Sequence, residues 1–241
     1  MLLPKSIPTL YIIAKERTPP TWEKVFQEND EELKEVSDFL KKDKRGFLPK
    51  TEDVFLAFNA VPLPDVKVVI LGQDPYYTYE NDGSPTAIGR AFSTRRGYKV
   101  APSLKNLYIE LERSIPGFVI PNHGDLSNWE KQGILLLNTS LTVPPNCQEE
   151  HVKIKLWNKF MYSIFKAIYD ANPNCIYILL GLKAKSWSPV LGDDTIKLYC
   201  SHPSPLSFRS GSNPCLGSDI FNMVNEELVK LHKTPIDWNL Y

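Results

Sequence analysis

The chain has 241 residues, of which 42% are hydrophobic and 23% charged, a composition typical of a globular protein with one large domain or two small ones. Its 28 basic and 28 acidic residues give a formal net charge of +0. This balance excludes an overall field that would draw the protein onto a polyanion, so any nucleic-acid surface must be a local patch.

The N-terminal segment MLLPKSIPTLYIIAKER carries an apolar patch that is too short and too interrupted by proline for a signal peptide or a membrane span. We expect residues 1–20 to form an extension and residues 21–241 to form a single domain. The four cysteines are widely spaced and include no CxxC pair, which favours a reduced setting over a disulfide framework. With no secretion or membrane signal, we expect an intracellular protein of the cytoplasm or nucleus.

Helical spacing of apolar residues begins after Thr21-Trp22 and continues to the charged segment KKDKR, which predicts a helical region there. A second helix start is indicated by Thr51-Glu52-Asp53. Further helical patterns follow Ser103, include Trp157, and follow Ser218. These helical patterns alternate with a second kind of segment.

The segments that alternate with the helical patterns are short, partly β-branched apolar runs. Each of them predicts a strand covered on both faces. Four such runs occur: KVVIL at 67–71, ILLL at 134–137, CIYILLG at 175–181 and TIKLYC at 195–200. Strands that alternate with helices predict an α/β fold, here a single domain with a central four-stranded, mostly parallel sheet flanked by helices on both faces.

Polar residues follow each predicted strand, and parallel strands bring their carboxyl ends to one edge, where ligands bind. We therefore expect four segments to converge: Gln73-Asp74-Pro75-Tyr76, Asn138, Gly181-Leu182-Lys183 and Ser201-His202-Pro203-Ser204-Pro205. Each polar residue also has a purely structural interpretation. Asp74 after a strand is typical of a helix cap or an Asx-turn, His202 of a turn, and Asn138 of a side chain bonded to its own backbone.

Several kinds of site fit this set poorly. The four histidines (His123, His151, His202, His232) form neither HxxxH nor HExxH, so we expect no metal. Neither GxGxxG nor GxxxxGK[ST] is present for a nucleotide cofactor, and GxSxG is absent for acyl transfer. A carboxylate, a histidine and an amide remain, beside Tyr76, Tyr77 and Phe92. These suit a flat, hydrogen-bonding ligand such as a base.

Four motifs together resemble family 1 uracil-DNA glycosylases: GQDPYY at 72–77, AFS at 91–93, LLLN at 135–138 and HPSPLS at 202–207. The resemblance runs from about Trp22 to TPIDW at 234–238, which would make 21–241 the catalytic domain. It implies a base-excision repair enzyme that flips uracil out of DNA and hydrolyses its N-glycosidic bond, leaving an abasic site. It further implies no metal or cofactor, uracil-containing DNA (single- or double-stranded) as the partner, no membrane contact and a monomer. A replication-associated protein partner stays an open question.

The resemblance assigns catalytic roles to Asp74, beside the developing oxocarbenium ion and the attacking water, and to His202, which donates to uracil O2. Phe92 would stack on uracil, Asn138 would read its edge, Tyr76 would block the methyl group of thymine, and the Gln73 main chain would assist. The expected DNA contacts are Leu206 as a wedge, Ser103 and Ser204 at phosphates, and Tyr77 and Arg209 nearby.

The chain departs from the family pattern at four points. Tyr77 stands where the family usually has histidine, and segment 78–91 is longer than usual. The proline-rich loop before the SLKNL helix is reduced to Ala101-Pro102, and Leu182 replaces a small or polar residue. Further basic residues predict a local DNA face, with His151 near it: Arg90, Arg95, Arg96, Lys99, Lys183 and Lys185. Two alternatives stay open, a non-catalytic DNA-binding module on the same fold and a base-excision enzyme of other specificity.

Overall fold

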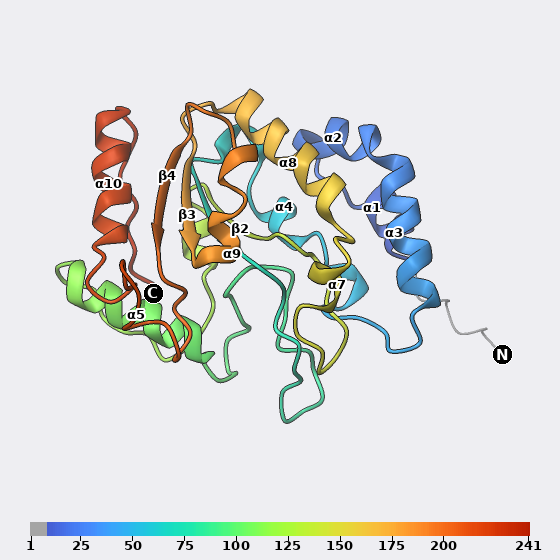
Figure 1. Cartoon of the computed structure of the whole chain (residues 1–241), viewed down its shortest axis with the longest axis horizontal. Helices are drawn as coiled ribbons and strands as arrows, with labels where there is room; N and C mark the ends of the chain where they lie inside the picture. The colour runs from blue at the N-terminus through green and yellow to red at the C-terminus, as the bar shows by residue number, and fades with distance from the viewer. Residues whose placement is uncertain (1–8) are drawn as a thin grey trace.

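The computed structural model describes residues 9–241, built around one sheet of four parallel strands (Figure 1). The strands are β1 (Val68–Gly72), β2 (Ile134–Asn138), β3 (Ile176–Leu180) and β4 (Ile196–Cys200). Their spatial order is β2-β1-β3-β4, and every pairing is parallel. The predicted α/β class, strand number and strand positions are confirmed, and within the described residues the sheet is wholly parallel.

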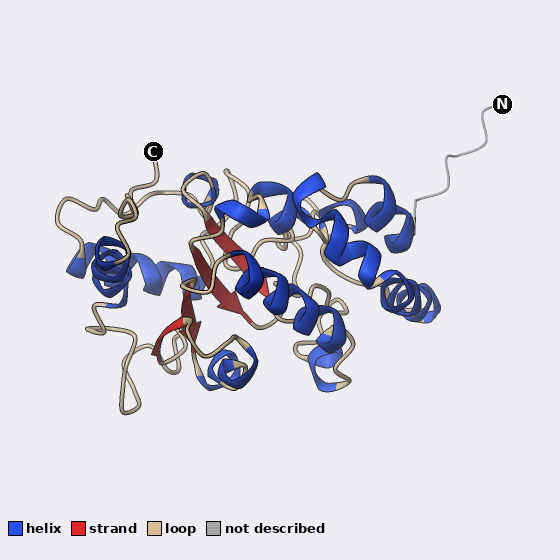
Figure 2. Ribbon diagram, turned by 90° about the horizontal axis from the view of Figure 1, so that it is seen from above, coloured by secondary structure: helices blue, strands red, loops and turns tan. Residues whose placement is uncertain are grey.

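Side chains along each inner strand alternate between two hydrophobic clusters, one on each face of the sheet. On β1, Val69 and Leu71 pack into the first cluster, whereas Val68 and Ile70 pack into the second. Figure 2 shows helices on both sides of the sheet, which leaves the strands buried between them. This double burial is the reason that the strands read as continuous apolar runs.

The helices divide between the two clusters. Residues of α1 (Leu10–Glu16), α2 (Glu23–Glu28), α3 (Asp30–Lys42), α4 (Leu56–Ala60) and α8 (Asn158–Ala171) enter the first cluster. Residues of α5 (Pro102–Ser114), α6 (Ser127–Glu130) and α10 (Ile220–Lys230) enter the second. Two further short helices are α7 (Glu150–Lys153) and α9 (Leu182–Lys185), and the 3₁₀ turns are η1 (Pro20–Trp22), η2 (Thr51–Asp53), η3 (Leu63–Asp65) and η4 (Ser188–Val190).

The first helical region is interrupted at Asn29, although the sequence pattern predicted continuity. The Asn29 side chain donates to the carbonyl of Val25 at 2.7 Å and accepts from Ser163 Oγ at 2.9 Å. An asparagine that bonds back to its own helix offers the backbone an alternative to continuing it. The pattern therefore splits into α2 and α3, and both helices bury apolar residues in the core, although Phe39 of α3 is exposed.

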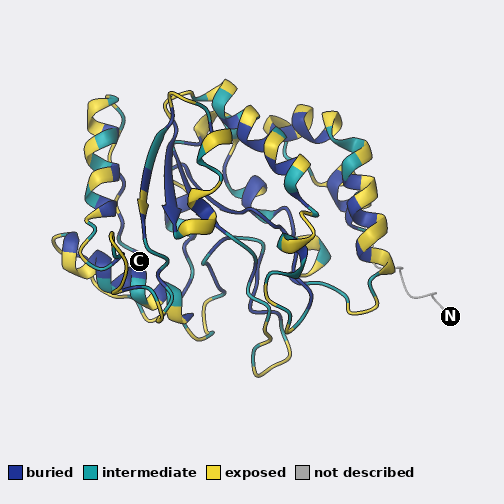
Figure 3. Ribbon diagram, in the orientation of Figure 1, coloured by how far each residue is buried: buried dark blue, intermediate teal, exposed yellow. Residues whose placement is uncertain are grey.

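The fourth strand is not covered on both faces, which corrects the prediction for that run. As an edge strand β4 leaves Tyr199 46% exposed, and Figure 3 shows its partial exposure beside the buried β3. The ammonium group of Lys185 lies 4.0 Å from the centroid of the Tyr199 ring. Within residues 9–241 no helix is both long and apolar enough to cross a bilayer.

Segment 78–91 forms a narrow ribbon that extends from the end toward which the strands point (Figure 1). Tyr79 and Pro85 form an antiparallel bridge, and the hydroxyls of Thr78 and Thr86 lie 3.2 Å apart. The Tyr98 hydroxyl donates to Asp82 Oδ2 at 2.9 Å and ties the tip to the next segment. The longer loop is therefore a hydrogen-bonded element of the protein surface.

Candidate active site

A crevice of about 940 Å³ lies beyond the carboxyl ends of the sheet. Its lining includes the last residue of every strand, Gly72, Asn138, Leu180 and Cys200. The expected segments do converge there, because Gln73, Asp74, Pro75, Tyr76, Asn138, Lys183 and His202 all line it. The prediction from topology alone is thus confirmed for the placement of these residues. Phe92, which topology did not place, also lines the crevice.

The ends of β1 and β2 are locked side by side at Gly72 and Asn138, which are partners in the parallel register. A Cβ atom at Gly72 would collide with Asn138 Oδ1, so any larger residue here would displace the Asn138 side chain. The N–H of Thr139 donates to the Gly72 carbonyl at 3.0 Å. Gly72 is thus a sequence signal for a side chain that lies across the strand end.

The Asp74 carboxylate is half-buried and is held by a distant segment. The N–H of Glu149 donates to Asp74 Oδ2 at 2.8 Å. This partner lies 75 residues away, which does not fit the interpretation of Asp74 as a simple helix cap or Asx-turn. Burial raises the pKa of Asp74, and the charge of Glu149 adds to that rise while Lys183 opposes it.

The His202 ring is oriented by its own turn. Its Nδ1 atom accepts a hydrogen bond from the Ser204 N–H at 3.0 Å, so in the neutral ring the proton sits on Nε2. Burial lowers the pKa of His202, and the charge of Lys183 lowers it further. His202 is therefore a neutral Nε2–H donor. A role in the turn accounts for the hydrogen bond at Nδ1 but not for the donor at Nε2. Gly181, at φ +90°, leaves room for it, since a Cβ there would lie 2.9 Å from the His202 Cβ.

Aromatic rings form one wall of the crevice. The Tyr76 hydroxyl donates to the Phe92 carbonyl at 2.9 Å, and burial raises the pKa of Tyr76, which keeps the phenol protonated. Phe92 has a left-handed backbone with φ +63°, and its ring centroid lies 6.3 Å from that of His202. Within residues 9–241 the Asn138 amide, 8% exposed, has no protein hydrogen-bond partner, so it is free to bind a ligand.

The residues expected to contact DNA lie around the rim. Leu206 is 94% exposed and Leu182 is 84% exposed, and both line the crevice with Ser103, Ser204 and Tyr77. The Asn106 amide of α5 donates to the Pro203 carbonyl at 2.7 Å and fastens the histidine loop to that helix. Arg209 is exposed but does not line the crevice, and its guanidinium carbon lies 5.7 Å from the Phe208 ring centroid.

Most arginines expected on the DNA face are paired with carboxylates instead. Arg90 lies 2.9 Å from Glu130, Arg95 3.0 Å from Asp53, and Arg96 3.1 Å from Asp125, measured nitrogen to oxygen. These ion pairs offset part of the arginine charge, so the basic patch is smaller than the sequence indicated. His151 is also not at the surface: it is 1% exposed, and its Nδ1 lies 2.8 Å from Thr142 Oγ1.

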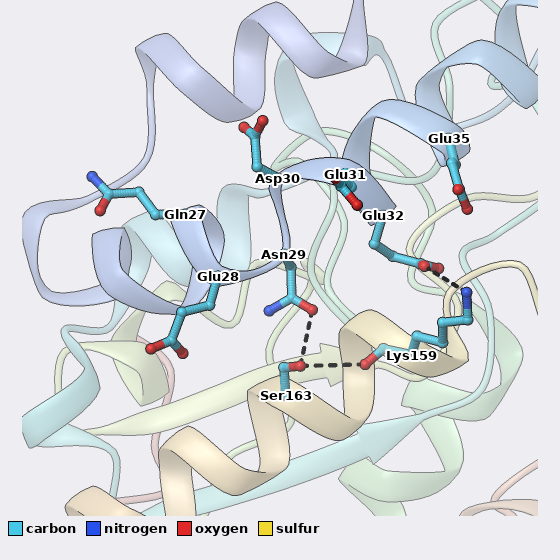
Figure 4. A pocket seen from close by; sticks show the side chains of 9 residues that line it. All are labelled: Gln27, Glu28, Asn29, Asp30, Glu31, Glu32, Glu35, Lys159 and Ser163. Carbon is cyan, nitrogen blue, oxygen red and sulfur yellow. Dashed lines mark hydrogen bonds and ion pairs between the residues drawn. The ribbon is translucent and has the colours of Figure 1, made fainter.

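A second hollow, of about 370 Å³, lies between α2, α3 and α8 (Figure 4). Its lining is acidic, with Glu28, Asp30, Glu31, Glu32 and Glu35. Lys159 pairs with Glu32 at 3.2 Å, and Figure 4 shows no convergence of the other carboxylates on one point. A phosphate backbone would be repelled here, which leaves the crevice as the candidate site. Within residues 9–241 no three His, Cys, Asp or Glu side chains are grouped to hold a metal ion.

Comparison with known proteins gives a consistent picture. Residues 58–229 match the family model of the uracil DNA glycosylase superfamily. The uracil-DNA glycosylase of Francisella tularensis subsp. novicida is 39% identical over 227 residues, covering 91% of this chain and 99% of that protein. That of Aliivibrio fischeri is 42% identical over 197 residues, covering 80% and 83%. The crystal structure of mimivirus uracil-DNA glycosylase has a TM-score of 0.86 at 28% identity, covering 97% of this chain and 90% of that one.

Proposed function

Because this chain belongs to the uracil-DNA glycosylase superfamily, we propose that Asp74, Asn138 and His202 perform its chemistry together in the crevice. The chain is a DNA repair enzyme, a hydrolase that excises uracil from DNA by cleaving its N-glycosyl bond. The pairing of Gly72 with Asn138 in the strand register carries the assignment, since it places the amide directly beside the Gln73-Asp74 segment. At the finer level, the motifs favour family 1.

The free amide of Asn138 is suited to reading uracil. Its oxygen accepts from N3–H while its nitrogen donates to O4, and cytosine presents the opposite pattern. Phe92, whose ring is partly buried, stacks on the flipped base, as an aromatic ring can on any flat heterocycle. The Tyr76 ring stands where a 5-methyl group would lie and rejects thymine sterically. The wall matters because a methyl group otherwise contributes only about 1–3 kcal/mol of discrimination.

Bond cleavage places positive charge on the sugar and negative charge on uracil. The ionised Asp74 stabilises the cation and orients the attacking water. The Nε2–H of His202, fixed by the bond that Nδ1 accepts from Ser204, donates to uracil O2 as the base becomes anionic. Preorganised groups of this kind supply much of the rate enhancement of enzymes, since they need no rearrangement at the moment of reaction.

DNA is bound at the rim of the same crevice. Leu206 fills the space that the flipped nucleotide leaves, and Ser103 and Ser204 hold phosphates with Tyr77 and Arg209 nearby. Uracil-containing DNA, single- or double-stranded, is the partner that we propose for a monomeric intracellular enzyme. We propose residues 21–241 as the catalytic domain; α1, which precedes them, packs its Leu10 and Ile13 into the first core cluster.

The proposed function is tested by incubating the protein with oligonucleotides that contain uracil, thymine or a mismatch, with EDTA present. We expect abasic sites from the uracil substrate alone. Absence of abasic product from uracil would overturn the proposal, and product from the mismatch would indicate the other base-excision specificity. DNA binding without any product would support the non-catalytic module instead.

Replacement of Tyr76 with alanine is expected to let thymine into the pocket. Removal of the ring should raise the excision of thymine relative to uracil and leave at most about the 10- to 200-fold preference that one methyl-sized difference provides without a wall. Tyr76→Phe is the matched control, because it loses only the bond to the Phe92 carbonyl and keeps the wall. Single-turnover assays on both bases measure the ratio. An unchanged ratio in Tyr76→Ala would remove the residue from specificity.

The pH dependence of the reaction follows from the two shifted groups. Asp74 must be ionised, and its pKa is raised above 3.8, so activity is lost as pH falls through that raised value. His202 must be neutral, and its pKa lies below 6.5, so its contribution is also lost on the acid side. We expect a single-turnover rate that is level around neutral pH and falls in acid, measured from about pH 4.5 to 8.5. A rate that rises as the pH falls below 6.5 would contradict both roles.

A further inference from the structure

An ion pair crosses the crevice directly over the end of β1. Glu149 follows β2 in the chain, and Lys183 lies on α9, which follows β3. In the sheet, β1 lies between β2 and β3, and the end of β1 leads into Asp74. The Lys183 ammonium and the Glu149 carboxylate are in direct contact, and both residues line the crevice. The pair therefore joins the two flanks of the site.

Glu149 is held in a conformation that a non-glycine residue rarely adopts. Its φ is +66°, in the left-handed region, and such conformations persist only where the surroundings impose them. Three contacts fix it here. Its N–H donates to Asp74 Oδ2 at 2.8 Å, its carbonyl accepts from the Lys153 N–H at 2.9 Å, and its carboxylate binds Lys183. One strained residue thus connects the rim lysine to the carboxylate at the centre.

We propose that Glu149 is a positioning residue for Asp74 and that Lys183 is the anchor that holds it in place. The inference rests on the catalytic role of Asp74 under the proposed function. In this arrangement the main chain of Glu149 aims one carboxylate oxygen of Asp74, which leaves the other for the water and the sugar. A small displacement of a reacting group can cost about 10²-fold in rate, so the anchor is expected to matter for the chemical step.

The charges of the pair act on the same two side chains that the reaction uses. Lys183 lowers the pKa of Asp74, which favours its ionised form, and lowers the pKa of His202, which favours its neutral form. The Glu149 N–H bond lowers the pKa of Asp74, whereas the negative charge of the Glu149 carboxylate raises it and so opposes Lys183. The other charged side chains that line the crevice are Arg90, which pairs with Glu130, and Lys185, which faces Tyr199.

The two members of the pair can therefore be separated by experiment. Lys183→Met is expected to lower the saturating single-turnover rate by about 10- to 100-fold and to move the acid limb of the pH profile to higher pH. Lys183→Arg keeps the positive charge, so it should retain the parental saturating rate and the parental position of the acid limb. Glu149→Gln should move the acid limb to lower pH, because the repulsion at Asp74 is removed. If the variants merely lost structure, the acid limb of the pH–rate profile would move in the same direction for Lys183→Met and Glu149→Gln. The inference predicts opposite directions.

Lys185→Met is the matched control, since it removes the same charge from the same helix without touching Glu149. We expect it to change the enzyme concentration needed for half-saturation and to leave the acid limb where it is. If Lys183→Met behaves like Lys185→Met, Lys183 is only a phosphate contact and the inference is wrong.

Asp74→Asn, assayed alongside, separates this inference from the proposed function. A slow Asp74→Asn with unaltered rates and pH profiles for the Lys183 and Glu149 variants would overturn the inference alone. A parental rate in Asp74→Asn would overturn the role of Asp74 itself. Thermal unfolding of each variant verifies that the fold is retained.

Discussion

Asp74→Asn is expected to slow the release of uracil by about 10³-fold, the loss typical when one preorganised electrostatic contact is removed from an active site. The amide is nearly the same size as the carboxylate and can still accept the N–H of Glu149. What it loses is the negative charge beside the developing oxocarbenium ion and the ability to orient water for attack. A single-turnover assay at saturating enzyme isolates this step from binding.

The matched control is Asp82→Asn, which makes the same chemical change in the exposed ribbon, where the carboxylate binds Tyr98. Asp82→Asn should leave the rate of the chemical step unchanged. In Asp74→Asn itself, the affinity for uracil-containing DNA and the melting temperature should remain close to those of the parent. An Asp74→Asn rate within a few-fold of the parent would exclude the carboxylate from the mechanism.

His202→Leu is expected to lower the rate by about 10²- to 10³-fold, because the hydrogen bond to the anionic uracil is lost. Leucine also removes the acceptor for the Ser204 N–H, so this variant alone mixes a loop effect with a chemical one.

Two further variants separate the effects. His202→Asn can keep the acceptor near Nδ1 but lacks a donor at the Nε2 position, and should be about as slow as leucine. His202→Gln can reach the Nε2 position and should recover part of the rate. Single-turnover rates of the three variants rank the contributions. A His202→Asn rate near that of the parent would show that the histidine serves the turn alone.

The sheet and the meeting of the site residues were predictable from the sequence. Fully covered parallel strands give short continuous apolar runs, and parallel strand ends must share an edge, so Asp74, Asn138 and His202 could be brought together by topology. Gly72 and Gly181 held further information. Both are glycines because a neighbouring site residue occupies the space of a Cβ atom, and a glycine at the end of a buried strand is a usable signal.

Long-range pairings were not predictable in the same way. The bond from the Glu149 N–H to Asp74 joins residues 75 positions apart, and main-chain donors leave no mark in a sequence. The pairing of Arg95 with Asp53 is likewise set by packing, so charge counting overestimated the basic face. The exposure of Tyr199 arises because β4 packs only into the second cluster, through Leu198 and Cys200, which the apolar run could not reveal.

The bond between the Tyr76 hydroxyl and the Phe92 carbonyl also constrains how this enzyme can evolve. Tyr76, which we propose selects the base, thus supports the left-handed backbone of Phe92, which we propose stacks on that base. A lineage in which a smaller residue replaced Tyr76 would widen the pocket and would also lose the hydrogen bond to the Phe92 carbonyl. Changes of base preference should therefore arise together with compensating substitutions in segment 91–93, and related sequences that differ at position 76 are where such paired substitutions should be found.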